Sequence, residues 1–149
     1  MAITQAIANS FKKELLDGDM SFKQTGGDTF KIALYISTAT LNSATTSYIT
    51  GGEVSATGQY AAGGGALVNN GTSMTAGVAR CDFADRSFTG VTLTARGALI
   101  YNTTAGSGSG TTDAVCILNF GADKTATSGT FTIQFPAPTS TAAILRISG

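Results

Sequence analysis

Few residues in this chain have the chemistry that catalysis requires. The sequence contains no histidine and no tryptophan, and 12% of its residues are charged. Asp82 and Asp85 are one candidate acid–base pair, of the kind that glycosidases use. They lie close together around one strand end, whereas a catalytic pair faces its partner across a cleft. We therefore expect no catalytic residue and no enzyme activity.

A metal site would have to use cysteines and carboxylates, because histidine is absent. Cys81 and Cys116 do not have the spacing of a zinc finger. Asp17 and Asp19, and likewise Asp82 and Asp85, are candidate calcium ligands, but turn and cap hydrogen bonds explain them more simply. We expect no metal and no cofactor.

Nucleophiles are present without partners that would activate them. Serine and threonine are plentiful, but no general base accompanies them. The glycine-rich residues 63–71 (GGGALVNNG) lack the lysine and the strand–turn–helix context of a phosphate-binding loop. Lys31 with Asn119 and either Asp28 or Glu53 is a candidate isopeptide set. A lysine whose amine reaches water is the simpler interpretation.

The two cysteines lie in apolar stretches, ARCDFAD and AVCILNF. They are either a disulfide or two buried thiols that act as small hydrophobic residues. A domain of this length does not need a disulfide, so we favour buried thiols. Pairing depends on geometry that the sequence does not give.

Length and charge indicate one neutral globular domain. The chain has 149 residues, 42% of them hydrophobic, with nine basic and nine acidic residues. A neutral chain lacks the electrostatic attraction that nucleic acid or an anionic membrane requires, so we expect neither as a partner. Near-zero charge favours association. The N-terminal residues lack the pattern of a signal peptide and no apolar run reaches membrane-spanning length, which predicts cytoplasmic synthesis.

Residues 3–16 are predicted to form one amphipathic helix. Ile3, Ile7, Phe11 and Leu15 recur every four residues and form a single apolar stripe. Thr4 is the candidate N-cap, and the Asp-Gly sequence at 17–18 is the candidate stop. The helix either covers its own sheet or contacts a neighbouring protein. We assign residues 1–20 to this helix and its lead-in, and residues 21–149 to a single β-sandwich domain.

Short strands separated by turn residues indicate a mainly β fold. Residues 30–36 alternate apolar and other side chains. Further strands are predicted at 53–55, 66–68, 78–83, 91–94, 97–101, 114–120, 130–135 and 142–147. This spacing favours an antiparallel β-sandwich with a jelly-roll-like topology. The predicted core contains Phe30, Ile32, Leu34, Ile36, Phe83, Leu99, Leu118, Phe131, Ile133, Phe135, Leu145 and Ile147.

Three stretches are predicted to be loops: residues 37–65, 102–113 and 121–129. The first is rich in Thr, Ser, Ala and Gly, and the second reads NTTAGSGSGTTD. Long loops in compact domains are usually functional or disordered. We interpret the first two as contact arms or exposed extensions, and the third as a short polar turn.

Several segments together resemble a family of small bacteriophage virion structural proteins. They include ITQAIANSFKKELLDG, GDTFKIALYISTATLNSATTSY, GGEVSATGQYAAGGGALV, CDFADRSFTGVTLTARGALIYN, ILNFGADKTATSGTFTIQFP and AAILRIS. The resemblance implies a non-enzymatic component, most specifically a capsid decoration (cement) protein on the outer surface of the head. It implies the major capsid protein and other copies of the chain, as a dimer or trimer, as partners. The Gly/Ser insertion at residues 103–112 departs from the family pattern.

The candidate partner interface combines the helix and the 37–65 arm. It consists of Ile3, Ile7, Phe11, Lys12, Leu15, Tyr48 and Tyr60, with the two tyrosines as anchors. Two other functions remain open at this point. One is a tail or fibre-associated virion protein that takes part in host attachment. The other is a carbohydrate-binding module or small hydrolase.

Overall fold

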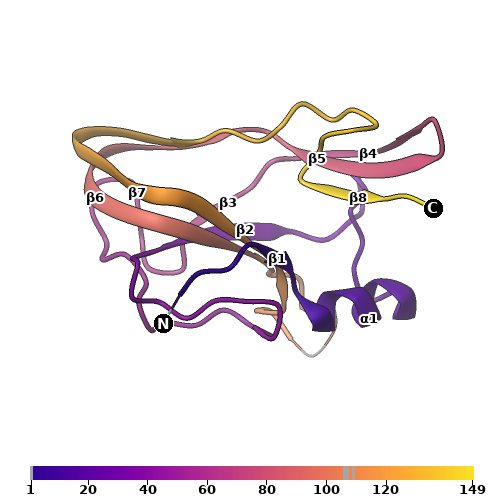
Figure 1. The fold of residues 1–149 in the computed structure, drawn as a ribbon, viewed down its shortest axis with the longest axis horizontal. Coiled ribbons are helices and arrows are strands. Elements are labelled where there is room, and N and C mark those ends of the chain that lie inside the picture. The colour runs from indigo at the N-terminus through magenta and orange to yellow at the C-terminus, as the bar shows by residue number, and fades with distance from the viewer. Residues whose placement is uncertain (1, 106–107, 109) are drawn as a thin grey trace.

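The chain folds into two antiparallel sheets and one short helix (Figure 1). The structure is a computed structural model that describes residues 2–105, 108 and 110–149. Its elements are β1 (Ala6–Ile7), α1 (Asn9–Asp17), β2 (Phe30–Tyr35), β3 (Gly65–Ala66), β4 (Asn69–Thr75), β5 (Val78–Phe83), β6 (Arg86–Asn102), β7 (Ala114–Ile133) and β8 (Leu145–Ile147). The strand orders are β1-β7-β6-β2-β3 and β4-β5-β8. The mainly β prediction is confirmed, and the jelly-roll topology stays a prediction.

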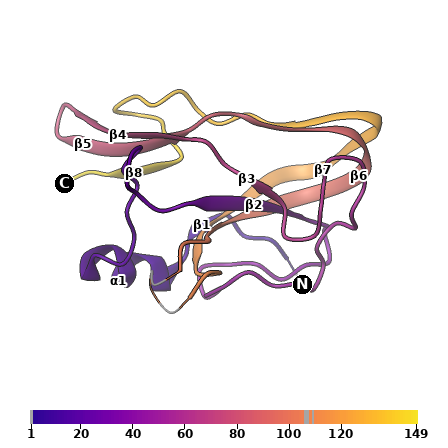
Figure 2. The same cartoon turned by 180° about the vertical axis from the view of Figure 1, so that it is seen from behind.

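A long β6–β7 hairpin in the five-stranded sheet doubles back on itself (Figures 1 and 2). The rings of Phe120 and Phe131, both in β7, lie 6.1 Å apart between centroids. In a straight strand they would be separated by about 36 Å. Irregular pairing between Phe88 and Gly97 marks the bend. The two ends of the hairpin therefore face each other across the core.

Two sequence predictions about this hairpin are wrong. Residues 91–94 and 97–101 belong to one strand, β6, and the predicted turn at 121–129 lies inside β7. Most side chains between 121 and 129 are exposed and polar, so they carry no apolar alternation. Their backbones nevertheless pair with β6, and Thr94 and Thr125 hydrogen-bond across the strands at 2.8 Å. Pairing with β6 satisfies the backbone hydrogen-bonding groups of this segment, so the segment forms a strand although neither of its faces is buried.

The N-terminal helix is shorter than predicted. Ile3 forms a bridge with Leu41, and the β1 residues pair with Cys116 and Ile117 at the edge of β7. Apolar spacing by four residues fits one face of a strand as well as a helix, because four is also a multiple of two. α1 therefore begins at Asn9, after β1. The predicted stop is confirmed, since Gly18 ends the helix with φ of +82°.

The predicted core is largely confirmed. Eight of its residues are buried: Phe30, Ile32, Leu34, Phe83, Leu99, Phe131, Ile133 and Phe135. Leu118 and Leu145 are partly buried. Ile36 and Ile147 were predicted wrongly, because their side chains are 40% and 60% exposed. Ile36 follows the last residue of β2, where the chain leaves the sheet, and Ile147 lies on the edge strand β8.

The strand β4 was not predicted, because its Asn, Gly, Ser and Thr residues resemble a loop. It pairs with β5 through a tight turn at Ala76 and Gly77, which both have positive φ. Residues 53–55, predicted as a strand, form only a single bridge from Glu53 to Tyr35. No helix among the described residues is long and apolar enough to cross a membrane.

Substitution of Gly64 tests how closely the arm at residues 37–65 approaches β2. Its φ is +83°, and an added Cβ would lie 1.8 Å from the carbonyl oxygen of Ile32. Gly77 is a matched control, because its φ is +76° and a Cβ there would meet nothing within 4 Å. We expect Gly77→Ala to lower the free energy of unfolding by about 1 kcal/mol through backbone strain alone. Gly64→Ala should lower it by about 3 kcal/mol or more, because overlap is added.

Urea denaturation of both variants measures the difference. Equal destabilisation by the two substitutions would contradict the close approach of Gly64 to β2.

Candidate functional site

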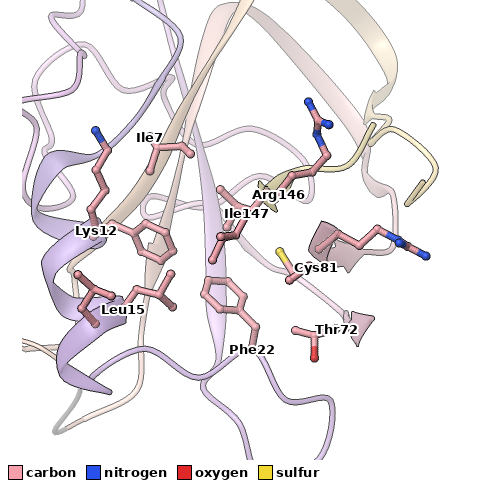
Figure 3. Close-up of a pocket in the computed structure, with 13 residues that line it drawn as sticks. Ile7, Lys12, Leu15, Phe22, Thr72, Cys81, Arg146 and Ile147 are labelled. Atoms are coloured by element: carbon pink, nitrogen blue, oxygen red, sulfur yellow. The ribbon is translucent and has the colours of Figure 1, made fainter. Parts of the chain in front are cut away.

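An apolar groove lies between α1 and the sheet β4-β5-β8 (Figure 3). Its volume is about 360 Å³, within the range of ligand-binding clefts. It is lined by Ile7, Phe11, Lys12, Leu15, Leu16, Phe22, Thr72, Ala79, Arg80, Cys81, Leu145, Arg146 and Ile147. Most of these side chains are apolar, so the groove offers nonpolar contact rather than a reaction site.

Strand register places the apolar side chains of the small sheet on one face. Ala79 is opposite Ile147, and Cys81 is opposite Leu145, in the pairing of β5 with β8. Residues two apart on a strand share a face, so these four side chains form one wall of the groove. The same face of β5 continues to Phe83 in the core. The groove is thus an open extension of the hydrophobic core.

The opposite wall comes from the N-terminal segment and helix. Ile7 of β1 and Phe11, Leu15 and Leu16 of α1 line it. Phe22, in the segment after the helix, also lines the groove and stacks on Phe30 with 4.7 Å between ring centroids. This stacking ties the groove to the core beneath it.

Exposed apolar residues concentrate around this groove. The structure has six exposed large hydrophobic side chains among its described residues: Ile7, Leu16, Ile36, Val68, Met74 and Ile147. Ile7, Leu16 and Ile147 line the groove, with Leu16 88% exposed. Met74 pairs with the groove residue Ala79. A contiguous apolar surface of this kind typically marks an interaction site.

Three basic residues lie at the rim of the groove. Lys12, Arg80 and Arg146 border it, and none of the lining residues is acidic. Within the described part of the chain, the ion pairs are Lys13–Asp17 and Arg96–Asp123, so none of the three rim cations is in one. Figure 3 shows the charged ends of Lys12 and Arg146 pointing away from the centre of the groove.

Arg80 and Arg146 are directly opposite each other on β5 and β8. Like charges at such positions repel. One guanidinium nitrogen of Arg80 donates to Thr75 Oγ1 at 2.9 Å, while its Nε and Nη1 are buried without a hydrogen-bond partner. Arg146 donates to the carbonyl oxygen of Ser140 at 2.9 Å. Arg80 and Arg146 alternate with Ala79, Cys81, Leu145 and Ile147 along β5 and β8, so their side chains leave the sheet on the face opposite the groove.

The predicted interface residues divide into two groups. Ile7, Lys12 and Leu15 line the groove, as Figure 3 shows. Ile3, Phe11 and Tyr60 are 6%, 4% and 1% exposed and pack inside this chain. Ile3 and Tyr60 therefore belong to the core of this chain, and the partner interface itself stays a prediction. Phe11, although buried, also lines the groove.

All four tyrosines of the chain lie near Glu53. Tyr48 and Tyr60 donate hydrogen bonds to the Glu53 carboxylate, and the Gly63 N–H donates to it at 2.7 Å. Tyr60 also accepts from the Leu34 N–H at 2.8 Å.

Burial, followed by the hydrogen bond and charge of Glu53, raises the pKa of Tyr48 to about 12. Tyr48 is partly buried and stacks on Tyr101, 5.0 Å away between ring centroids. The tyrosine–Glu53 cluster therefore holds the 37–65 arm against the sheet of the same chain. Tyr48 and Tyr60 stabilise this arm through their hydrogen bonds.

The two candidate catalytic acids, Asp82 and Asp85, bind different groups of the chain. Asp82 accepts a hydrogen bond from Asn70 Nδ2 at 2.8 Å, and Asp85 accepts one from the Phe135 N–H at 2.8 Å. Asp17 pairs with Lys13 on the exposed face of α1. No group of three or more potential ligands among His, Cys, Asp and Glu could hold a metal ion within the described residues.

The candidate isopeptide residues are not brought together. Lys31 pairs with Tyr101 of β6, whereas Asn119 pairs with Gly97, which lies four residues before Tyr101 in that strand. The Asn119 amide donates to the Ile3 carbonyl oxygen at 2.8 Å. Asp28 accepts from the Asn102 amide at 2.7 Å, and Glu53 bonds the tyrosines. Each proposed partner of Lys31 has another structural role.

The groove was largely missed in the sequence. Leu16 lies off the apolar stripe that was recognised, and Leu145 and Ile147 were assigned to the core. Two adjacent leucines at the end of an amphipathic helix were the one available signal, since only one of them fits the buried face. The Gly/Ser insertion was expected at 103–112, but residues 106, 107 and 109 lie outside the described residues.

Comparisons of the chain with protein-family models, curated proteins and solved structures find no match. The resemblance to virion proteins therefore remains an expectation from the sequence.

Both cysteines are free and buried, which supports the buried-thiol interpretation. Burial is the main reason that the pKa of each thiol is raised to about 12. At pH 8 roughly one thiol in ten thousand is then a thiolate, the reactive form. We expect both Cys81 and Cys116 to react with a disulfide reagent only after unfolding in guanidinium. Rapid modification of the folded protein, followed by absorbance, would be inconsistent with these positions.

Glu14 of α1 gives a pH-dependent contribution to stability. Burial first, then the hydrogen bond and charge of Asp113, raise its pKa from 4.5 to about 7. The folded state therefore binds this proton more tightly than the unfolded state does. The resulting stabilisation is complete below pH 4.5 and is lost as the pH rises through 7.

We expect the wild type to lose stability relative to Glu14→Gln, which mimics the neutral acid, between pH 4.5 and 8. Urea unfolding of both proteins at several pH values measures this difference. A stability difference that is independent of pH would rule out the raised pKa.

Proposed function

We propose that this chain is a non-enzymatic bacteriophage virion protein that binds the outside of the assembled head and stabilises the capsid lattice. The observation that carries the proposal is the exposed apolar groove on a chain with no net charge. The resemblance of its segments to virion structural proteins supports the same assignment. In this function the major capsid protein is the partner, and the chain acts by binding to it.

Binding of this kind stabilises a shell by linkage. A protein that binds the expanded lattice, and not the unexpanded one, shifts the equilibrium towards the expanded state. Repetition over a symmetric shell multiplies a modest contact free energy. A folded β domain with one exposed apolar face is sufficient for this function, because no chemical step is needed.

Deletion of the N-terminal residues 1–16 is not a suitable test of the interface. Residues 1–16 include Ile3, Ala8 and Phe11, which are buried in the core. Their deletion would expose much of the core and unfold the domain. Loss of head binding after such a deletion would therefore not identify an interface. Point substitutions at exposed positions are the appropriate variants.

The direct test uses emptied heads of the phage that encodes the chain. We expect the purified protein to co-sediment with expanded heads and not with unexpanded heads, because only the expanded lattice presents the complete site. Electron microscopy should then show regular added density over the head. Density confined to the tail would favour the host-attachment alternative and contradict the proposal. Equal binding to both head forms would contradict selective stabilisation.

A further inference from the structure

We propose that Glu14 and Asp113 form a pH-sensitive latch, which holds the α1 wall of the groove against the rest of the chain at low pH and releases it as the pH rises. The two carboxyl groups share one proton when the latch is closed. The inference concerns the free chain, so it is tested separately from the proposed function. It assigns the pH-dependent loss of stability to one element, α1.

The two carboxyl groups meet from different elements of the fold. Glu14 lies in α1, and Asp113, which is 2% exposed, directly precedes β7. A Cβ added to Gly108 would overlap both Asp113 Oδ2 and Glu14 Oε2, so these two oxygens lie beside each other next to Gly108. Two carboxylates this close repel each other strongly, and one of them therefore keeps its proton.

The charges around Glu14 are mostly negative. The charged side chains that act on it are Asp113, Asp19 and Lys13, and the loop residues 103–112 carry no charge. Lys13 is 80% exposed, so water screens its charge. Glu14 Oε2 is buried and has no hydrogen-bond partner among the described residues. Burial, and then the hydrogen bond and charge of Asp113, therefore keep Glu14 neutral up to a pKa of about 7.

The position of α1 depends on few contacts. The helix has nine residues and no side-chain hydrogen bond at its N-cap, so it is marginal by itself. Its first half is held by the buried Phe11 and by a hydrogen bond of 2.8 Å from the Asn9 N–H to the Ser43 carbonyl oxygen. Its second half borders the open groove, and Glu14 links this half to Asp113. Breaking this link would loosen the second half of α1 while both sheets stay folded.

The sign of the pH dependence follows from the proton. In the closed state Glu14 holds its proton more tightly than in the open state, where water reaches the carboxyl group. The stabilisation of the closed state is complete below pH 4.5 and is lost as the pH rises through 7. Both carboxylates are then charged, and their repulsion favours the open state. The groove thereby loses a firmly held helical wall.

Hydrogen–deuterium exchange of the free chain at pH 5 and at pH 8 tests the latch. The wild type and Glu14→Gln are compared at the same pH, so the intrinsic exchange rates of their amides are nearly equal. Glu14→Gln keeps a neutral group at this position, and its latch should stay closed at both pH values. We expect the ratio of wild-type to variant exchange in α1 to rise about tenfold or more from pH 5 to pH 8. In the central strand β2 this ratio should stay the same.

Two further variants test the identity of the pair. Asp17→Asn removes a carboxylate that pairs with Lys13 on the exposed face of the same helix, and it should keep the pH dependence of the wild type. Asp113→Asn removes the charge that faces Glu14, so exchange in α1 should depend less on pH than in the wild type. Because Asp113 is buried, thermal unfolding must first show that this variant is folded. The comparison of Glu14→Gln with Asp17→Asn decides without it.

Three results would overturn the inference. One is a ratio of wild-type to Glu14→Gln exchange in α1 that is the same at both pH values. Another is an equal rise of this ratio in α1 and β2, because that pattern indicates global unfolding and not local release. The third is loss of the pH dependence in Asp17→Asn, which would assign the effect to the exposed face of α1. None of these measurements involves phage heads, so they leave the proposed function untouched.

Discussion

The bend in the β6–β7 hairpin is the constraint on which the rest of the structure depends. Because both strands double back, the residues on either side of the bend supply opposite sides of one core, as the contact between Phe120 and Phe131 shows. The bend also directs β5 and β8 over the region of α1 (Figure 2). Phe88, Val91 and Leu93, within the bend, are buried, but the space between α1 and the small sheet stays open.

That open space explains why apolar residues are exposed in one place. β8 contributes only three residues and is the edge of its sheet, so no further strand covers Ile147. The helix is also short, and Leu16 lies away from its buried face. The tyrosine–Glu53 cluster has the opposite effect at the 37–65 arm, because it satisfies polar groups internally. The groove is thus the region where packing within the chain is incomplete.

Strongly alternating segments could be predicted from the sequence, but the path of the hairpin could not. Phe30, Ile32 and Leu34 share one apolar face of β2, and all three are buried. Ala33 and Tyr35, on the other face, are buried as well. Residues 121–129 lack that alternation because their pairing depends on backbone groups, which every residue carries. For the same reason β4 resembled a loop.

The candidate site was only partly predictable. Leu15 could be found from helical periodicity, and Ile7 was found through the same spacing although it lies in β1, whereas Ile147 could not be separated from core residues by its type alone. Whether an apolar strand residue is buried depends on which strand lies beside it and on what covers the sheet. Tyr60 shows the reverse case, since an anchor-like aromatic in a polar loop is needed to hold the loop itself.

Hydrogen–deuterium exchange of the head-bound chain tests the central claim most directly, because it locates the contact without any substitution. We predict slower exchange on binding in α1 and in β8, the two walls of the groove, and little change in the exposed 121–129 part of β7. Slower exchange confined to residues away from the groove, with α1 and β8 unchanged, would contradict the claim that this protein acts through its apolar groove.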